Sequence, residues 1–428
     1  MIYCNSQFQG KQWQLNLIKF LNFTYVNIFG LVKDINKMEL RGKGRRKMPE
    51  LECKRLFLSG NEALCEGALY AGCNFYAGYP ITPASEIIEI LSKRMPALGR
   101  VSMQLEDEIS SLAAVIGASL AGAKAMTATS GPGMSLMQEN IGLAVMCEIP
   151  LVVANIMRGG PSTGLPTKPA QGDVMQARYG SHGDYELVVL IPNSVQESFD
   201  LIIEAFNISE MLRVPVIFLS SADVAHMRET AIIPENGAIP ILNRKSPTGL
   251  ETDFRPFDNN YPDLVPPMPI FGEGYRTHYT GLTHNEYGFP SDDPVVHTKL
   301  IERLEKKITN KIDEITKLDG RFLDDAELIV ISYGSPSRAA LQAIIDARNE
   351  GLKVGYIRLI TLWPFPLKTL EKICATASKI LVLELNTGQL VHQVRLLGTG
   401  KVYFYPKIGG ALYTPDEILS EIRWCLKK

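Results

Sequence analysis

Residues 101–140 constrain the fold more than any other part of this 428-residue chain. Their sequence is VSMQLEDEISSLAAVIGASLAGAKAMTATSGPGMSLMQEN, in which a short strand precedes three acidic residues and a helix of small and apolar residues. Residues 121–129 return as a small-residue strand, and Ser130-Gly131-Pro132-Gly133 form a turn whose backbone amides can approach a ligand. An acid at the start of a helix is commonly a cap that complements the helix dipole. The order of elements predicts a parallel α/β sheet, and the acid beside the glycine turn is its candidate site.

The composition is typical of a globular protein with two or three domains, since 46% of the residues are hydrophobic and 21% are charged. The 44 basic and 46 acidic residues leave a net charge of -2, which gives no general electrostatic case for binding nucleic acid or an anionic membrane. The seven cysteines include no Cys-x-x-Cys pair, so no metal or iron–sulfur site is predicted in this chain. Scattered thiols of this kind fit a reducing cytoplasm.

The first 47 residues differ from the rest of the chain. They hold an apolar stretch that Lys19, Asn22 and Asn27 interrupt, which makes a poor transmembrane helix, and Met48 would be a natural start for the folded protein. We therefore interpret residues 1–47 as an upstream extension that is not native to the folded chain. A membrane anchor is the alternative.

The remaining sequence divides into three parts. Residues 48–231 alternate strands and helices, which predicts a first α/β domain. Residues 232–320 are dense in Pro, Gly, Asn and Asp, so we expect an irregular arm followed by an amphipathic connecting helix from about His297 to Leu318. Residues 321–428 alternate again and predict a second α/β domain.

Two further motifs follow predicted strands of the first domain. Tyr79-Pro80-Ile81-Thr82 comes directly after a strand, where open α/β sheets bind ligands, and Thr82 or Ser85 could cap the next helix. Arg158 follows the buried strand at 149–155 and offers a planar fork for a carboxylate. On the residues alone, a structural loop and a solvated arginine remain open alternatives.

The core segment resembles the pyrimidine-binding module of thiamine-diphosphate enzymes. The resemblance rests on a Glu before a small-residue helix, the Gly-Ala-Lys-Ala return at 122–125 and the Thr-Ser-Gly-Pro-Gly turn at 129–133. In that family the Glu shares a proton with the aminopyrimidine ring of the cofactor and so activates the neighbouring thiazolium carbon. The resemblance assigns this role to Glu108, with Glu106 as the alternative. It also implies that the cofactor lies against a set of turn residues, namely Tyr79, Pro80, Ile81, Ser130, Gly131 and Pro132.

The Tyr-Pro-Ile-Thr-Pro sequence at 79–83 resembles a signature of 2-oxoacid:ferredoxin oxidoreductases. The long loop at 159–184 is similar to that of their separate alpha subunits, particularly those of the 2-oxoglutarate and branched-chain types. The resemblance implies that Thr82 and Arg158 orient the 2-oxoacid. A dicarboxylate needs a second cation, for which Lys168 and Arg178 are candidates. The implied fold is a doubly wound, pyrimidine-type thiamine-diphosphate-binding domain followed by a C-terminal transketolase-like α/β domain.

The chain lacks the Gly-Asp-Gly motif with which thiamine enzymes hold the diphosphate through Mg²⁺. The resemblance therefore implies a beta subunit that supplies the diphosphate site, Mg²⁺ and a [4Fe-4S] cluster, with ferredoxin, and in larger complexes gamma and delta subunits, as further partners. The expected reaction is the oxidative decarboxylation of 2-oxoglutarate with coenzyme A to succinyl-CoA, CO₂ and reduced ferredoxin, or its reverse.

Three alternatives to this reaction stay open. The substrate could be a branched-chain 2-oxoacid such as 2-oxoisovalerate, or pyruvate. The chain could be a non-catalytic scaffold for a beta subunit. It could also belong to a thiamine-dependent lyase that transfers no electrons.

Overall fold

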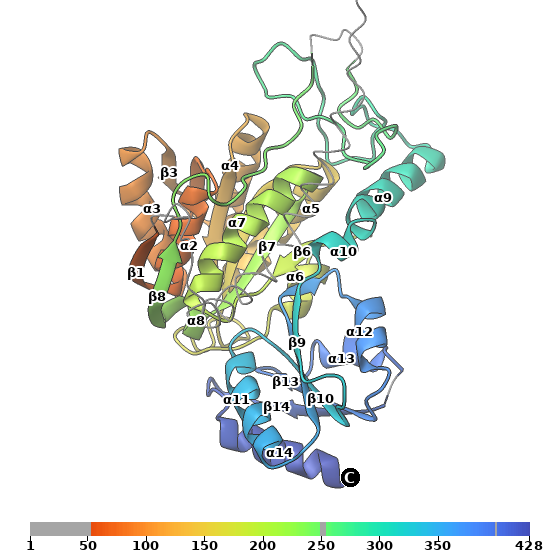
Figure 1. The fold of residues 1–428 in the computed structure, drawn as a ribbon. Helices are drawn as coiled ribbons and strands as arrows, with labels where there is room; N and C mark the ends of the chain where they lie inside the picture. Colours follow the sequence, from red (N-terminus) through yellow and green to blue (C-terminus); the bar gives the residue numbers. More distant parts are fainter. Residues whose placement is uncertain (1–52, 249–253, 399) are drawn as a thin grey trace, which may run out of the picture. The chain divides into compact units, whose positions relative to one another are not determined.

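The computed structural model describes residues 53–248, 254–398 and 400–428. The extension expected at 1–47 lies outside the described residues. Cys53–Lys428 form one unit, within which the chain builds two large sheets that helices cover and one two-stranded sheet (Figure 1).

The first sheet has seven strands in the order β12-β6-β7-β5-β4-β2-β3. Its parallel strands are β2 (Phe75–Gly78), β3 (Val101–Gln104), β4 (Ala125–Thr129), β5 (Leu151–Met157), β6 (Val188–Leu190) and β7 (Pro215–Ser221). Because β2 pairs with both β3 and β4, the chain reverses its winding direction there. Ligands bind doubly wound sheets at such a switch point, outside the carboxyl ends of the strands.

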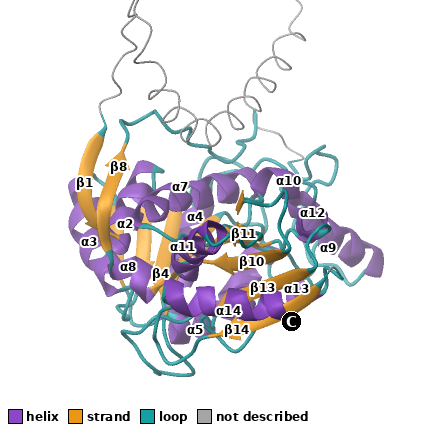
Figure 2. Ribbon diagram, turned by 60° about the horizontal axis from the view of Figure 1, so that its bottom comes forward, coloured by secondary structure: helices purple, strands orange, loops and turns teal. Residues whose placement is uncertain are grey.

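Helices cover both faces of this sheet. Apolar residues of α4 (Glu108–Leu120) and α5 (Gly131–Met146) pack in the core on one face. The other face is covered by α2 (Gly60–Tyr70), α3 (Ser85–Ala97) and α7 (Val195–Leu212). The expected doubly wound α/β class is confirmed, and Figure 2 shows the helices around the strands.

Two expectations about helix ends were wrong. The N-cap of α3 is Ala84, which makes no side-chain cap, because the helix begins at Ser85 itself and neither Thr82 nor Ser85 reaches an N-terminal amide. The connecting helix is also shorter than expected. It is α9 (Pro294–Thr309), followed by the single turn α10 (Ile312–Ile315) and by β9 (Leu318–Arg321).

A two-stranded sheet and a buried cluster of ion pairs lie outside the seven-stranded sheet. Strand β1 (Lys54–Ser59) pairs antiparallel with β8 (Arg228–Ile233), apart from the main sheet, and the short helices α6 (Val174–Tyr179) and α8 (Ala222–His226) lie between strands. Arg303 and Lys307 of α9 both form ion pairs with buried Glu148, which tie the arm to the turn before β5. Burial alone would raise the pKa of Glu148, but Arg303, Lys307 and Arg213 outweigh it and lower the pKa to about 2.

The second sheet has the strand order β14-β13-β10-β11-β9, in which only β9 is antiparallel. Its other strands are β10 (Leu328–Tyr333), β11 (Val354–Leu359), β13 (Lys379–Glu384) and β14 (Lys401–Pro406). Its helices are α11 (Pro336–Asn349), α12 (Leu367–Cys374), α13 (Val391–Arg395) and α14 (Pro415–Lys427). The intervening β12 (Thr361–Trp363) pairs antiparallel with β6, so the C-terminal part contributes the last strand of the first sheet.

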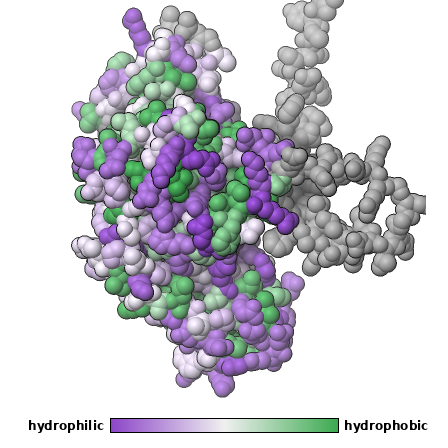
Figure 3. Space-filling view, turned by 90° about the vertical axis from the view of Figure 1, so that its left-hand side faces the viewer, coloured by the Kyte–Doolittle hydropathy of each residue, from purple (hydrophilic) through white to green (hydrophobic). Residues whose placement is uncertain are grey.

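The opposite edge of the first sheet is β3, whose Val101 and Met103 are exposed. Figure 3 views the molecule from this side and shows apolar and polar surface intermixed. Within the ranges that the structure describes, no helix has both the length and the apolar character to cross a membrane.

Candidate functional site

The structure separates the two candidate acids at the start of α4. Asp107 is the N-cap, and its side chain accepts a hydrogen bond from the Ser110 amide at 2.7 Å, so capping is done by neither candidate. Glu106 is exposed, whereas Glu108 is 4% exposed. Burial raises the pKa of Glu108, and a hydrogen bond with Thr129 lowers it in part. Glu108 is therefore the desolvated carboxyl group, and its raised pKa suits it to sharing a proton with a ligand.

The glycine turn at 130–133 packs directly on Glu108. The Ser130 carbonyl accepts hydrogen bonds from the amides of Gly133 (2.8 Å) and Met134 (3.1 Å), which starts α5. A Cβ atom on Gly133 would lie 2.2 Å from Oε1 of Glu108 and 2.1 Å from Oγ1 of Thr129. Only glycine at position 133 leaves room for this carboxylate, so the position of Glu108 depends on the glycine turn.

Thr82 and Arg158 also lie together. Nη1 of Arg158 donates a hydrogen bond to the Thr82 carbonyl at 2.6 Å, while the Thr82 residue is exposed. Arg158 is 7% exposed, and its Nε has no partner among the described residues. Tyr79 and Pro80 are exposed and Ile81 is half-buried, so this strand-end turn forms an open rim.

The buried Asn155 and the half-buried Asp173, which the sequence analysis missed, join these groups. Asn155 of β5 is the register partner of Thr129, and its Nδ2 donates to Oδ2 of Asp173 at 3.0 Å. The Asp173 carboxylate faces the α5 turn, because a Cβ atom on Gly131 would lie 3.7 Å from Oδ2. The Gln-Gly-Asp sequence at 171–173 lacks the third glycine of the diphosphate motif, and its place within the long loop at 159–184 was the only signal in the sequence.

The candidate second cations are not equivalent. Arg178 pairs with Glu186 at 2.6 Å and stacks on the rings of Tyr179 and Tyr185. Lys168 is exposed, and its carbonyl accepts a hydrogen bond from the amide of Gly159, the residue after Arg158, at 3.1 Å. The structure thus brings the Lys168 backbone next to Arg158, whereas the side chain of Arg178 is occupied by its ion pair with Glu186.

Unpaired buried atoms show what this arrangement can bind. Ser130 Oγ, Asn155 Oδ1 and Arg158 Nε are all buried without a hydrogen-bond partner in the described chain. Such atoms are costly unless a ligand or water satisfies them. Together with the desolvated Glu108, they fit a polar heteroaromatic ring and a small anion. Among the described residues, no group of three or more His, Cys, Asp or Glu side chains could hold a metal ion.

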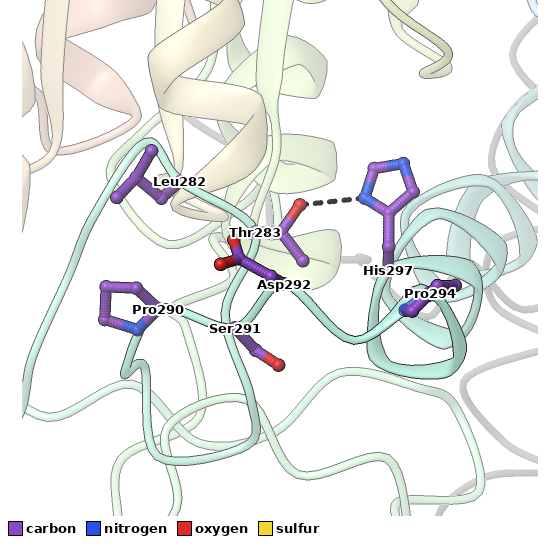
Figure 4. Close-up of a pocket in the computed structure, with 7 residues that line it drawn as sticks. All are labelled: Leu282, Thr283, Pro290, Ser291, Asp292, Pro294 and His297. Atoms are coloured by element: carbon purple, nitrogen blue, oxygen red, sulfur yellow. Dashed lines mark hydrogen bonds between the residues drawn. The ribbon is translucent and has the colours of Figure 1, made fainter.

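A separate pocket of about 440 Å³ opens in the arm (Figure 4). It is lined by Leu282, Thr283, Pro290, Ser291, Asp292, Pro294 and His297. Thr283 Oγ1 and His297 Nδ1 are hydrogen-bonded there at 2.8 Å. None of the candidate site residues lines this pocket, so it is separate from the site built around Glu108 and Arg158.

Known proteins match both parts of the chain. The family described as pyruvate flavodoxin/ferredoxin oxidoreductase, thiamine diphosphate-binding, matches residues 66–303, and pyruvate:ferredoxin oxidoreductase core domain II matches residues 326–418. The chain is 51% identical over 366 residues to the 2-oxoglutarate synthase subunit KorA of Methanocaldococcus jannaschii, covering 85% of this chain and 97% of the relative. It is 34% identical over 377 residues to the ketoisovalerate oxidoreductase subunit VorB of Methanothermobacter thermautotrophicus, covering 86% and 96%.

A solved structure agrees with these matches. The 2-oxoglutarate:ferredoxin oxidoreductase from Magnetococcus marinus, with 2-oxoglutarate, coenzyme A and succinyl-CoA bound, superposes with a TM-score of 0.84 at 33% identity. The match covers 93% of this chain and 70% of that chain. The chain therefore belongs to the thiamine-diphosphate-binding pyruvate flavodoxin/ferredoxin oxidoreductase family.

Proposed function

We propose that this chain is the alpha subunit of a 2-oxoglutarate:ferredoxin oxidoreductase. Its reaction is the oxidative decarboxylation of 2-oxoglutarate with coenzyme A to succinyl-CoA, CO₂ and reduced ferredoxin, or the reverse carboxylation. The observation that carries the proposal is the buried Glu108 carboxyl group packed on Gly133, together with the buried Arg158, which directly follows β5. Relatives and a solved structure that act on 2-oxoglutarate support this substrate, and the ketoisovalerate relative is more distant.

Glu108 is the proposed catalytic residue toward thiamine diphosphate. Its raised pKa suits a shared proton with a ring nitrogen, and the Thr129 hydroxyl lies beside the carboxyl group against Gly133. The bound cofactor would supply the nucleophilic carbon that attacks the keto group. Two sets of turn residues would hold the cofactor, namely Ser130, Gly131 and Pro132, and Tyr79, Pro80 and Ile81.

Arg158 and Thr82 are proposed to orient the 2-oxoacid. The unpaired Nε of Arg158 leaves part of its planar fork free for the substrate carboxylate, and the exposed Thr82 lies beside it. For the second carboxylate of 2-oxoglutarate we favour Lys168 over Arg178, since the guanidinium of Arg178 already pairs with Glu186.

The site requires a partner chain. Tyr79 of the strand-end turn is 39% exposed, and Ile109, the residue after the buried Glu108, is 48% exposed, so both turns of the site present apolar side chains to a partner. We assign this surface to a beta subunit that carries the diphosphate-binding domain, Mg²⁺ and a [4Fe-4S] cluster, with ferredoxin as acceptor and gamma and delta subunits in a larger complex. Every cysteine of the described residues is a free thiol, which supports a reducing cytoplasmic setting.

The test uses the complex co-expressed with its beta subunit. Reduction of ferredoxin or a viologen dye is measured with 2-oxoglutarate, 2-oxoisovalerate and pyruvate. We expect the highest kcat/KM with 2-oxoglutarate. If the complex shows no activity with 2-oxoglutarate, the assignment of this substrate is wrong.

Two matched variants test whether the chain is a non-catalytic scaffold, and an iron assay tests whether the complex is a lyase that transfers no electrons. Glu108→Gln should lower kcat by about 100-fold or more, while Glu106→Gln, on an exposed side chain two residues away, should change nothing. Full activity of Glu108→Gln would favour the scaffold alternative. A purified complex that contains no iron would favour a lyase.

A further inference from the structure

We propose that Asp173 is a positioning residue of this site and that the C-terminal sheet holds it in place through Gln171 and Gln389. The inference rests on the proposed function and adds to it a residue outside the family resemblance. Asp173 acts on two groups of the site, the amide of Asn155 and the charge of Arg158.

The first effect is the orientation of the Asn155 side chain. An ionised carboxylate only accepts hydrogen bonds, so the Asp173 contact at 3.0 Å fixes the NH₂ group of Asn155 on the Asp173 side. Oδ1 of Asn155 must then face away, and it is buried without a donor in the described chain. Asn155 is fully buried and pairs in register with Thr129, which contacts Glu108. Oδ1 of Asn155, the acceptor without a donor, therefore belongs to a residue that is separated from Glu108 only by Thr129.

The second effect is electrostatic. Burial raises the pKa of Asp173, and the hydrogen bond from Asn155 and the nearby Arg158 charge lower it in part. No ion pair joins Asp173 to Arg158, so the guanidinium keeps its Nε for a ligand while a nearby negative charge weakens its attraction for anions. Such a carboxylate limits how tightly the 2-oxoacid binds before the reaction.

The C-terminal sheet holds the backbone on both sides of Asp173. Gln389 donates from Nε2 to the Gly172 carbonyl at 2.5 Å, and its Oε1 accepts from the Met175 amide at 2.9 Å. One side chain thus spans the segment that contains Asp173.

Gln171 anchors the same segment more deeply. It is fully buried and donates to the Tyr333 carbonyl at 3.0 Å, while its Oε1 accepts from the Leu385 amide at 2.9 Å. Its own carbonyl accepts from Nδ2 of Asn386 at 2.8 Å. Nδ2 of Asn386 also donates to Glu384 at 2.9 Å, so the loop is tied to the carboxyl ends of β10 and β13.

The experiment compares the wild-type co-expressed complex with the Asp173→Asn and Gln389→Leu complexes at one fixed pH. Asp184→Asn is the matched control, because Asp184 is an exposed acid on the same loop. Steady-state kinetics give KM and kcat for 2-oxoglutarate. Calorimetry gives the Kd of 2-oxoglutarate for the complex freed of thiamine diphosphate, and size-exclusion chromatography reports assembly.

Asp173→Asn should lower the Kd by about fivefold, because a charge that opposes the anion is gone. It should also lower kcat by about tenfold. An amide at 173 can both donate and accept hydrogen bonds, so it no longer holds the Asn155 side chain in one of its two orientations. Gln389→Leu should lower kcat by about threefold or more with assembly unchanged. General structural damage would instead weaken binding and assembly together.

An Asp173→Asn complex with wild-type Kd and kcat, or with weaker binding, overturns the role of Asp173. A Gln389→Leu complex with wild-type kcat overturns the role of the C-terminal sheet. Failure of the wild-type complex to oxidise any 2-oxoacid contradicts the proposed function instead, so the two failures are distinguishable.

Discussion

The carboxylate of Glu108 touches the backbone of Gly133, since a Cβ atom on residue 133 would lie 2.2 Å from Oε1 of the acid. A residue at the start of α4 and one in the first turn of α5 thus depend on each other. The Gly-Pro-Gly sequence is explained as much by the acid it accommodates as by the turn it makes.

Gly133→Ala should displace Glu108 and lower kcat by about 100-fold, because real Cβ atoms do not approach oxygen this closely and the carboxyl group must move. Steady-state ferredoxin reduction by the complex measures this change. Gly117→Ala on the exposed face of α4 is the control, since nothing lies within 4 Å of its Cβ position, and it should stabilise the protein by about 0.5–1 kcal/mol. Similar effects of both substitutions on kcat would contradict the contact.

Arg158→Lys should raise the KM for 2-oxoglutarate by about tenfold or more, because an ammonium group can keep the contact with the Thr82 carbonyl but offers no planar fork. Initial rates over a range of substrate concentrations measure it. Arg178→Lys is the matched change on an arginine paired with Glu186, and we expect a lower midpoint of thermal unfolding with the KM unchanged. A raised KM for 2-oxoglutarate in Arg178→Lys would instead indicate that Arg178 contacts the substrate.

Lys168→Met should discriminate between substrates by charge. We expect kcat/KM for 2-oxoglutarate to fall by about tenfold, because its second carboxylate loses a cation, while a monocarboxylate such as 2-oxobutyrate is converted as before. The ratio of the two kcat/KM values is the measurement. Equal losses for both substrates would point to a disturbed loop, since the Lys168 backbone is hydrogen-bonded to Gly159.

The Glu148 cluster predicts part of the acid sensitivity of the fold. The pKa of Glu148 falls from 4.5 to about 2 on folding, so its contribution to stability is complete above 4.5 and is lost as the pH falls toward about 2. Glu148→Gln should abolish this part of the pH dependence. At neutral pH it should cost about 3–5 kcal/mol in the free energy of unfolding, because Arg303 and Lys307 remain buried without their partner.

Urea unfolding at several pH values measures both effects. Glu302→Gln removes an exposed partner of Lys306 on the same helix and should change the unfolding free energy by less than about 0.5 kcal/mol. Parallel pH profiles of the wild-type protein and Glu148→Gln would show that the cluster does not stabilise the fold in this way.

The sequence by itself determined the class of fold and the order of the main strands and helices, but not every helix end. The strands and helices around residues 101–140 follow from local hydrophobic period and turn residues, which act over a few positions along the chain. The motifs at 79–83 and 129–133 indicated the family for the same reason, because each is a short contiguous run.

Only the tertiary structure decided which side chains work together. Asp107 takes the cap of α4, so Glu108, one position further round the helix, turns into the core while Glu106 stays in solvent. Asp173 enters the site because Gln389 holds its loop through a hydrogen bond to Gly172, a residue 217 positions away in the chain. Such pairings depend on how distant segments pack, and the spacing of residues within one segment carries no information about them.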